Sequence, residues 1–225
     1  MCKMPSKSQT YFSRDRYQPD ALKSSNLPDT TTWPDLPKGS LVLIDAANWD
    51  ISVRKFSPDL YPDYTRFIDS LPDNSNPIIF TALTPNGDLG LTGLTDRTDK
   101  IPQIVARHMK SSGNRNKGNV DVDLAIHAAH QIFQIIHTTR KDNRPHLVIV
   151  SGDSDFIPVV DLAHKYGIKV HILAFQSTLS KDLADTADSV IHPGIDLVRV
   201  GFRQQPRYRW STTPGFSRSR YRNIS

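Results

Sequence analysis

The sequence of 225 residues contains only one cysteine, Cys2. A single thiol supports neither an intrachain disulfide nor a cysteine-based zinc site, so both are excluded. No apolar run approaches the roughly 18 residues of a membrane span, and the polar N-terminus lacks the apolar region of a signal peptide. Asp15 and Asp20 argue against an organelle transit segment, which is poor in acidic residues. We therefore expect a cytoplasmic protein that does not contact membranes.

Acidic residues are absent from the end of the chain, residues 197–225. Arginines alternate there with aromatic residues, as in Arg207-Tyr208-Arg209-Trp210. This composition is typical of segments that contact phosphates and stack on nucleobases. The formal net charge of +5 at pH 7 also favours a polyanionic partner. An unstructured solubilising tail is the alternative, and the two interpretations are compatible because such tails often become ordered on nucleic acid.

The length of the chain suits one α/β domain with flanking segments and is short for two domains. Residues 1–38 are polar, contain five prolines and show no sustained hydrophobic period. This pattern predicts a leader that is disordered or loosely packed, with Trp33 holding its end to the core. We place the domain at residues 39–196 and a basic tail at residues 197–225.

The stretch 147–173 predicts the centre of that domain. The apolar run 147–150 is typical of a strand buried on both faces, an acidic turn follows it, and a helix with Gly167 as its C′ residue leads to a second buried strand. Such a βαβ unit places its ligand-binding turn at the carboxyl end of the first strand. Asp155 is the expected N-cap of the helix, which leaves Asp153 without a structural explanation.

Comparable patterns predict the rest of a doubly wound α/β fold. The expected strands are 40–44, 77–82 and 190–191, and the expected helices are 59–70, 101–109, 120–137 and 180–187. Glycines and turn residues in 84–100 indicate a mobile loop, and residues 110–118 indicate a flexible basic loop.

Acidic residues follow or begin three of these elements. Asp45 follows the first strand, Asp121 opens the helix 120–137, and Asp153 and Asp155 follow the strand 147–150. A turn or helix cap explains Asp45, and an anion at a helix N-terminus, after Asn119 as N-cap, explains Asp121. Each explanation is sufficient for a single residue. None accounts for the gathering of all of them at one edge of the sheet.

The acidic residues within the helix 120–137 point in different directions. Asp121 and Asp123 are two positions apart, so only one can face a site. We expect Asp121 to point inward and Asp123, in line with His127, to point toward solvent or the rim. The three histidines of this helix are spread around it and do not form a zinc set. Asp188, after the helix 180–187, lies either near the same sheet edge or in a cap.

In a doubly wound sheet the carboxyl ends of the strands share one edge, so we expect Asp45, Asp121 and the Asp153/Asp155 pair to meet there and to bind a divalent cation. Oxygen ligands without cysteine favour Mg²⁺ or Mn²⁺ over zinc. Such an ion can activate a water for in-line attack on a phosphodiester. Asn48 is suited to hold a water or a phosphate oxygen, and Arg115 and Lys117 are suited to clamp the flanking phosphates.

Three motifs in order, I-D-A-A-N-W (44–49), K-G-N-V-D-V-D-L-A (117–125) and V-S-G-D-S-D-F-I-P-V-V (150–160), resemble the NYN domain of the PIN-like nuclease superfamily, close to its LabA-like members. The resemblance implies a three-layer α/β sandwich around a mostly parallel sheet of about five strands. It also implies a ribonuclease that uses Mg²⁺ or Mn²⁺. The implied catalytic acids are Asp45, Asp121, Asp153 and, by position, Asp155, with the first three as metal ligands. The expected substrate contacts are Asn48, Arg115, Lys117, Ser151 and Ser154.

The sequence thus predicts a metal-dependent endoribonuclease for single-stranded or structured RNA, and it leaves a homodimer open. A catalytically weak or inactive RNA-binding adaptor of the same fold is the alternative, favoured by His127, which stands where many relatives have an acidic residue. A phosphatase or phospho-acceptor protein of another α/β family is a third hypothesis. Its usual signature needs a second aspartate two residues after the first, and that position is Ala47.

Overall fold

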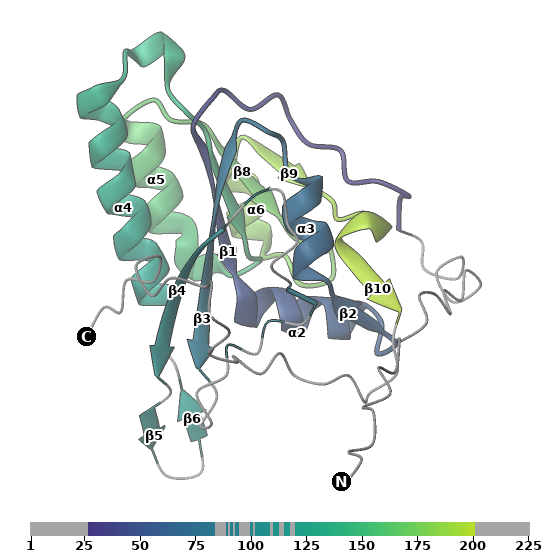
Figure 1. The fold of residues 1–225 in the computed structure, drawn as a ribbon. Helices are drawn as coiled ribbons and strands as arrows, with labels where there is room; N and C mark the ends of the chain where they lie inside the picture. Colours follow the sequence, from purple (N-terminus) through teal and green to yellow (C-terminus); the bar gives the residue numbers. More distant parts are fainter. Residues whose placement is uncertain are drawn as a thin grey trace, which may run out of the picture.

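The structure is a computed structural model that describes residues 27–83, 89, 91, 93–94, 100, 102–108, 110–112, 115–117 and 120–200. Its centre is a six-stranded sheet in the order β4-β3-β1-β7-β8-β9, and each neighbouring pair is parallel. The strands are β1 (Ser40–Asp45), β3 (Ser75–Leu83), β4 (Gln103–His108), β7 (Leu147–Val150), β8 (Val170–Leu173) and β9 (Ser189–Ile191). The expectation of a mostly parallel α/β sheet is confirmed (Figure 1).

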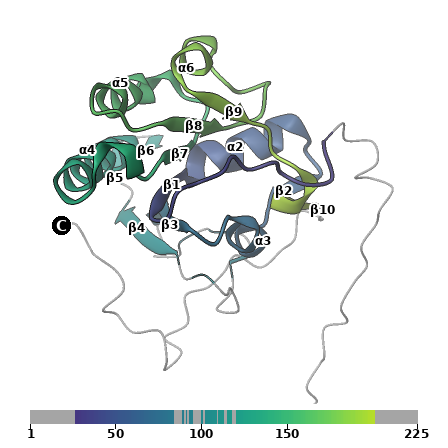
Figure 2. The ribbon, with the colours of Figure 1, turned by 90° about the horizontal axis from the view of Figure 1, so that it is seen from above.

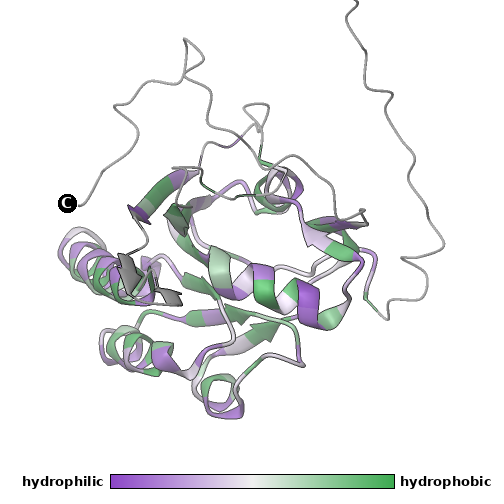
Figure 3. Ribbon diagram, turned by 90° about the horizontal axis from the view of Figure 1, so that it is seen from below, coloured by the Kyte–Doolittle hydropathy of each residue, from purple (hydrophilic) through white to green (hydrophobic). Residues whose placement is uncertain are grey.

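Helices cover both faces of this sheet, which gives three layers (Figure 2). One face carries α4 (Val120–Thr138), α5 (Ile157–Lys165) and α6 (Lys181–Thr186), and the other carries α2 (Ala46–Phe56) and α3 (Tyr64–Ser70). Alternate residues of β1 enter the two cores: Val42 packs on the α2 and α3 side and Leu43 on the α4 and α5 side. Burial on both faces explains the continuous apolar strands, which Figure 3 shows in green.

A small antiparallel sheet closes the α2 and α3 side. It pairs β2 (Leu60–Pro62) with β10 (Val198–Val200). The segment before β1 packs here too. Trp33 stacks on Phe67 with ring centroids 6.4 Å apart, and Thr31 donates to Asp196 from both its N–H and its hydroxyl. The expected anchoring by Trp33 is confirmed. Residues 27–38 and 197–200, which the sequence assigned to leader and tail, therefore pack on the domain.

The predicted helix 101–109 is wrong, because residues 103–108 form the edge strand β4 beside β3. Ile104 and Val105 are adjacent in sequence and buried in the two opposite cores of the sheet. A strand directs successive side chains to opposite faces, whereas one face of a helix would hold both. The pairing partner, which is distant in sequence, decides the conformation.

Two further segments differ from their predictions. The expected flexible loop 110–118 contains a two-stranded hairpin, β5 (Lys110–Ser112) with β6 (Arg115–Lys117). The helix expected at 59–70 begins only at Tyr64, after β2, with Asp63 as its N-cap. Most of the predicted mobile loop 84–100 and the expected N-cap Asn119 lie outside the described residues.

The short 3-10 turns are η1 (Lys141–Asn143), η2 (Ser154–Phe156) and η3 (Ile195–Leu197). Gly167 ends α5 with φ at 69°, which is the left-handed conformation expected of a C′ glycine. Among the described residues, no helix combines the length and apolar character needed to cross a membrane.

Candidate functional site

The site lies where β1 and β7 end side by side. These strands are parallel neighbours, with Ile44 level with Val150, so the residues after them emerge at the same edge of the sheet. Two hydrogen bonds join the segments that follow. The Ser151 hydroxyl donates to Asp45 Oδ2 over 3.5 Å, and the Gly152 N–H donates to Asn48 Oδ1 over 3.2 Å.

Asp45 is the most buried acid of this edge, with 3% of its surface exposed. It is the N-cap of α2 and accepts a hydrogen bond from the Asn48 N–H over 3.0 Å. Burial raises the pKa of Asp45 to about 6, and the charges of Asp121 and Asp153 contribute to the rise. The prediction of a helix cap is therefore correct. The raised pKa shows in addition that the negative charge of Asp45 is unfavourable in this position, which capping alone does not require.

Asn48 links the first and third motifs. Its Oδ1 accepts from the Gly152 N–H and from the Ser52 hydroxyl, the latter over 3.3 Å. Because the carbonyl oxygen is engaged within the protein, only the amide Nδ2 of Asn48 is suited to reach a substrate. The bond to Gly152 holds the turn after β7 against the first turn of α2.

Gly152 is required for space. A Cβ at this position would lie 2.3 Å from the carbonyl oxygen of Thr178, and Ser180 donates its N–H to the Gly152 oxygen over 2.9 Å. A glycine after a strand is typical of a tight turn. The structural reason is the close passage of the segment that follows β8.

Asp153, and not Asp155 as the sequence predicted, is the capping residue of this turn. Asp153 caps the turn η2 by accepting the Asp155 N–H over 3.1 Å, and its own N–H donates to the Ser151 hydroxyl over 3.3 Å. Asp155 and Ser154 are exposed, and no side chain caps α5. The expected capping by Asp155 is wrong because a 3-10 turn precedes the helix and moves the cap position to Asp153.

Asp121 lies in the first turn of α4 and is half-buried. Burial raises its pKa, and the charges of Asp153 and Asp155 raise it further. Acids from β1, α4 and the turn after β7 thus act on one another electrostatically. Arg115 and Lys117 lie on β6, in the hairpin that precedes α4.

The acids at this edge of the sheet are candidate ligands for a divalent ion. In the parts of the chain that the structure describes, no three His, Cys or Asp side chains are near enough together to hold a metal by themselves. All 23 acidic residues are aspartates, so no longer glutamate can reach across the edge. The all-oxygen donors and their mutual repulsion fit Mg²⁺ or Mn²⁺, which can be held by one or two carboxylates with waters in the remaining positions.

Asp123 does not point to solvent as predicted. Its carboxylate forms a two-pronged ion pair with the guanidinium of Arg107 on β4, and its side chain is 10% exposed. The ion pair raises the pKa of Arg107. His127, one turn further along α4, packs edge-on against Phe80 with ring centroids 5.5 Å apart. The prediction failed because β4 was interpreted as a helix, so Arg107 was not placed beside α4.

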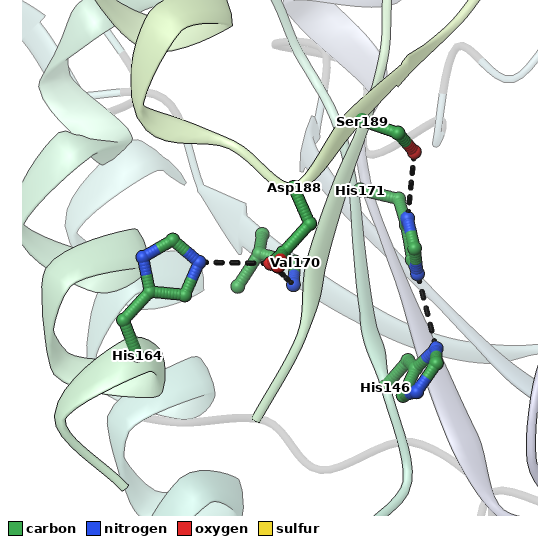
Figure 4. A network of polar contacts seen from close by, with 6 residues as sticks. All are labelled: His146, His164, Val170, His171, Asp188 and Ser189. Carbon is green, nitrogen blue, oxygen red and sulfur yellow. Dashed lines mark hydrogen bonds and ion pairs between the residues drawn. The ribbon is translucent and has the colours of Figure 1, made fainter. Parts of the chain in front are cut away.

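Asp188 lies at the opposite edge of the sheet. It accepts the Val170 N–H over 2.7 Å and pairs with His164 Nε2 at 2.8 Å, at the amino ends of β8 and β9 (Figure 4). Beside it, His171 contacts His146 at 3.0 Å and Ser189 at 2.8 Å. The suggestion that Asp188 joins the candidate site is therefore wrong.

Sequence reasoning missed Asp50, which lies on α2 behind the site. The Tyr64 hydroxyl donates to Asp50 Oδ1 over 2.9 Å and lies 3.2 Å from the Ala46 oxygen. Burial raises the pKa of Asp50 to about 6, against the opposing effects of the Tyr64 hydrogen bond and the Arg54 charge. Nothing in the local sequence distinguishes Asp50 from a surface acid, because its partner comes from another helix.

Comparison with known proteins places this arrangement in a family. No curated protein matches the chain. The crystal structure of a Vibrio parahaemolyticus protein of unknown function is similar, with a TM-score of 0.53 and 17% sequence identity. The match covers 74% of this chain and 99% of the other, and this similarity supports the fold alone. The family model of the NYN domain matches residues 40–196, which span the six-stranded sheet and all three motifs. The chain therefore belongs to the NYN domain family, within the PIN-like nuclease superfamily.

Proposed function

We propose that this protein is a metal-dependent endoribonuclease, cytoplasmic and close to the LabA-like members of its family. The observation that carries the proposal is the joining of two motif turns by the Ser151–Asp45 and Gly152–Asn48 hydrogen bonds, with Asp121 coupled electrostatically to both. Family membership favours nuclease chemistry.

Asp45, Asp121 and Asp153 are the proposed ligands of Mg²⁺ or Mn²⁺, one or two of them bound to the ion directly and the rest through waters. The bound ion would neutralise their repulsion and lower the pKa of a water that attacks the phosphodiester. Asp45 loses its proton more readily when a cation replaces the lost solvation, and the Asn48 N–H orients its carboxylate. Ser151 holds both Asp45 and the Asp153 backbone, so it positions two of the three ligands.

RNA is the proposed substrate, single-stranded or structured. The exposed Ser154 and Asp155 lie at the rim, where Ser154 can contact a phosphate and Asp155 can assist the ion through a water. Arg115, Lys117 and the arginine-rich segment beyond Val200 are the proposed phosphate contacts.

The direct test is incubation of end-labelled RNA with the full chain in Mg²⁺, in Mn²⁺ and in EDTA. We expect cleavage with metal, none with EDTA, and a loss of at least 100-fold in Asp153→Asn, which removes a ligand charge. Asp161→Asn, an exposed acid on α5, is the matched control and should cleave normally. Absence of cleavage with both metals, or equal cleavage by Asp153→Asn, would count against the proposal.

The second candidate is an RNA-binding adaptor without nuclease activity. His127 in place of a frequent acid, and the lack of a ready-made three-ligand cluster among the described residues, favour it. This reading predicts salt-sensitive RNA binding that is lost on removal of residues 201–225 and is not accompanied by cleavage.

A further inference from the structure

The outer face of α4 carries an apolar stripe. Val122 is 49% exposed, Ile126 is 64% exposed and Phe133 is 43% exposed, and together they are three of the four large hydrophobic residues that are exposed in the described parts of the chain. Ala129, half-buried, lies between them. The spacing of four, three and four residues keeps these positions on one side of the helix. We call Val122, Ile126, Ala129 and Phe133 the α4 stripe.

The α4 stripe is surrounded by uncharged residues. From Leu124 to Thr138 the helix contains no Asp, Glu, Lys or Arg, and its other exposed positions are His130, Gln134, His137 and Thr138. The solvent face of a surface helix normally carries charges. The centre of a protein interface is instead depleted of charge and enriched in aromatic and aliphatic residues. The composition of this face is therefore that of an interface.

The order of residues in the stripe matches a two-fold axis. Val122 and Phe133 are equally far from its midpoint, and so are Ile126 and Ala129. When two copies of α4 pack antiparallel, each Phe133 faces the smaller Val122 of the other copy, and each Ile126 faces an Ala129. Large residues then oppose small ones at every level, which is the self-complementarity that an isologous interface needs.

Phe133, the last residue of the α4 stripe, is held in place by a neighbouring ring. Phe133 packs edge-on against Tyr166, the C-cap of α5, with ring centroids 5.7 Å apart, and Lys165 Nζ lies 5.8 Å from the centre of the Tyr166 ring. The exposed ring of Phe133 is therefore oriented by its neighbour before any partner binds, which reduces the side-chain entropy lost on association.

The chain's own C-terminal segment is the competing occupant of the stripe. The described chain ends at Val200 in β10, which pairs with β2 on the α2 and α3 side of the sheet, across from α4 (Figure 2). Residues 201–225 also carry six arginines, which a stripe without carboxylates does not neutralise. A second copy of this chain fits the stripe better on both grounds.

We propose that the protein forms a two-fold homodimer through the α4 stripe, with the two α4 helices antiparallel. The α4 stripe lies on the outer face of α4, and its pairing does not depend on nuclease activity. In sedimentation experiments over a concentration series, the full chain should approach twice the monomer mass. Ile126→Glu, at an exposed position, should stay at the monomer mass with unchanged circular dichroism.

Ile51→Glu is the matched control, because Ile51 is 54% exposed on α2, which covers the other face of the sheet. It should dimerise like the wild type. A wild type that is monomeric throughout the series would overturn the proposal, and so would a dimer that Ile126→Glu leaves intact. A full chain that stays monomeric while the protein without residues 201–225 dimerises would overturn it as well, because the chain's own segment would then occupy the stripe.

The register is tested with cysteine variants in a Cys2→Ser background. A mixture of Val122→Cys and Phe133→Cys copies should form disulfide-linked dimers under mild oxidation, whereas each variant alone should link at least tenfold less. Predominant linkage of Val122→Cys to itself would indicate parallel helices and would overturn the antiparallel arrangement.

Discussion

The Gly152 N–H donates to Asn48 Oδ1 over 3.2 Å and thereby fastens the turn after β7 to the start of α2. Removal of this acceptor leaves a buried N–H without its partner. Asn48→Ala should lower the free energy of unfolding by about 1–3 kcal/mol, the usual cost of such a group. Urea denaturation measures this change.

Asn48→Asp restores an acceptor for the Gly152 N–H, so it separates the effect of the lost hydrogen bond from the effect of charge. It should regain part of the stability lost in Asn48→Ala, although its extra negative charge at the acidic edge keeps it below wild type in the absence of metal. Asn143→Ala, at an exposed position in η1, is the control and should change stability by less than about 0.5 kcal/mol. Equal losses for Asn48→Ala and Asn143→Ala would mean that the bond to Gly152 does not contribute.

Asp45→Asn should make the fold more stable at pH 7 while it abolishes the proposed RNA cleavage. The pKa of Asp45 is raised to about 6, so the folded state binds the proton more tightly than the unfolded state, and the ionised carboxylate destabilises the fold above pH 6. Asparagine keeps an acceptor for the Asn48 N–H and removes the charge. We expect a gain of about 1–2 kcal/mol, less than the roughly 3 kcal/mol that two pKa units represent.

The gain from Asp45→Asn should disappear as the pH falls toward 4, where wild-type Asp45 is protonated. Urea denaturation at pH 7 and pH 4.5 checks this dependence. Asp161→Asn should have the same small effect at both pH values because Asp161 is exposed. A destabilised Asp45→Asn at pH 7 would show that the capping bond outweighs the burial of the charge.

Magnesium should raise the melting temperature of the wild type, because an ion that binds only the folded state stabilises it by mass action. The rise should be smaller in Asp153→Asn, which removes one proposed ligand, and unchanged in Asp161→Asn. Thermal unfolding with and without Mg²⁺, at constant ionic strength, provides the measurement. An equal rise in the wild type and in Asp153→Asn would argue that no ion sits at this edge.

The strands that form the centre of the sheet were predictable because they are buried on both faces. The apolar runs 40–44 and 147–150 need no partner to be recognised as strands. The segment 101–109 was not predictable in this way. Its apolar residues fit one face of a helix, and only pairing with β3 decides that Ile104 and Val105 point to opposite cores.

The residues of the candidate site also differ in how far the sequence predicts them. Asp45 and Asp153 follow buried strands, so the sequence placed them at one edge from topology alone. Contacts between elements that are far apart in sequence could not be predicted. Asp123 was assigned to solvent because nothing local pairs it with Arg107, and Asp50 was overlooked because its partner, Tyr64, comes from another helix.

Gly152→Ala should damage the site through its backbone. The added Cβ would meet the Thr178 carbonyl oxygen at 2.3 Å, and a backbone group cannot rotate away as a side-chain tip can. We expect a loss of stability of at least about 2 kcal/mol, typical of forced overpacking, and loss of the Mg²⁺-dependent rise in melting temperature. Gly167→Ala is a useful comparison, since its positive φ of 69° should cost about 1 kcal/mol without affecting the response to Mg²⁺.

The histidines at the other edge of the sheet should make stability depend on pH. Burial lowers the pKa values of His171 and His146; the Lys169 charge lowers both further, and the Asp188 charge opposes this. The folded state therefore binds these protons less readily than the unfolded state, and stability is lost as the pH falls below 6.5, the ordinary histidine value. The raised pKa values of Asp45 and Asp50 have the opposite effect, because their contribution to stability is lost as the pH rises toward 6. The pH dependence of wild-type stability therefore contains both contributions.

Comparison of variants separates the histidine contribution from that of the acids. His171→Asn removes one titrating group of the His146–His171–Ser189 chain. Although the substitution destabilises the fold at pH 7 by opening a buried contact, it should reduce the further loss of stability between pH 7 and pH 5. His192→Asn, at an exposed position, should leave the pH dependence unchanged. Urea denaturation at several pH values gives each slope, and a His171→Asn slope equal to that of the wild type would mean that His171 titrates alike in the folded and unfolded states.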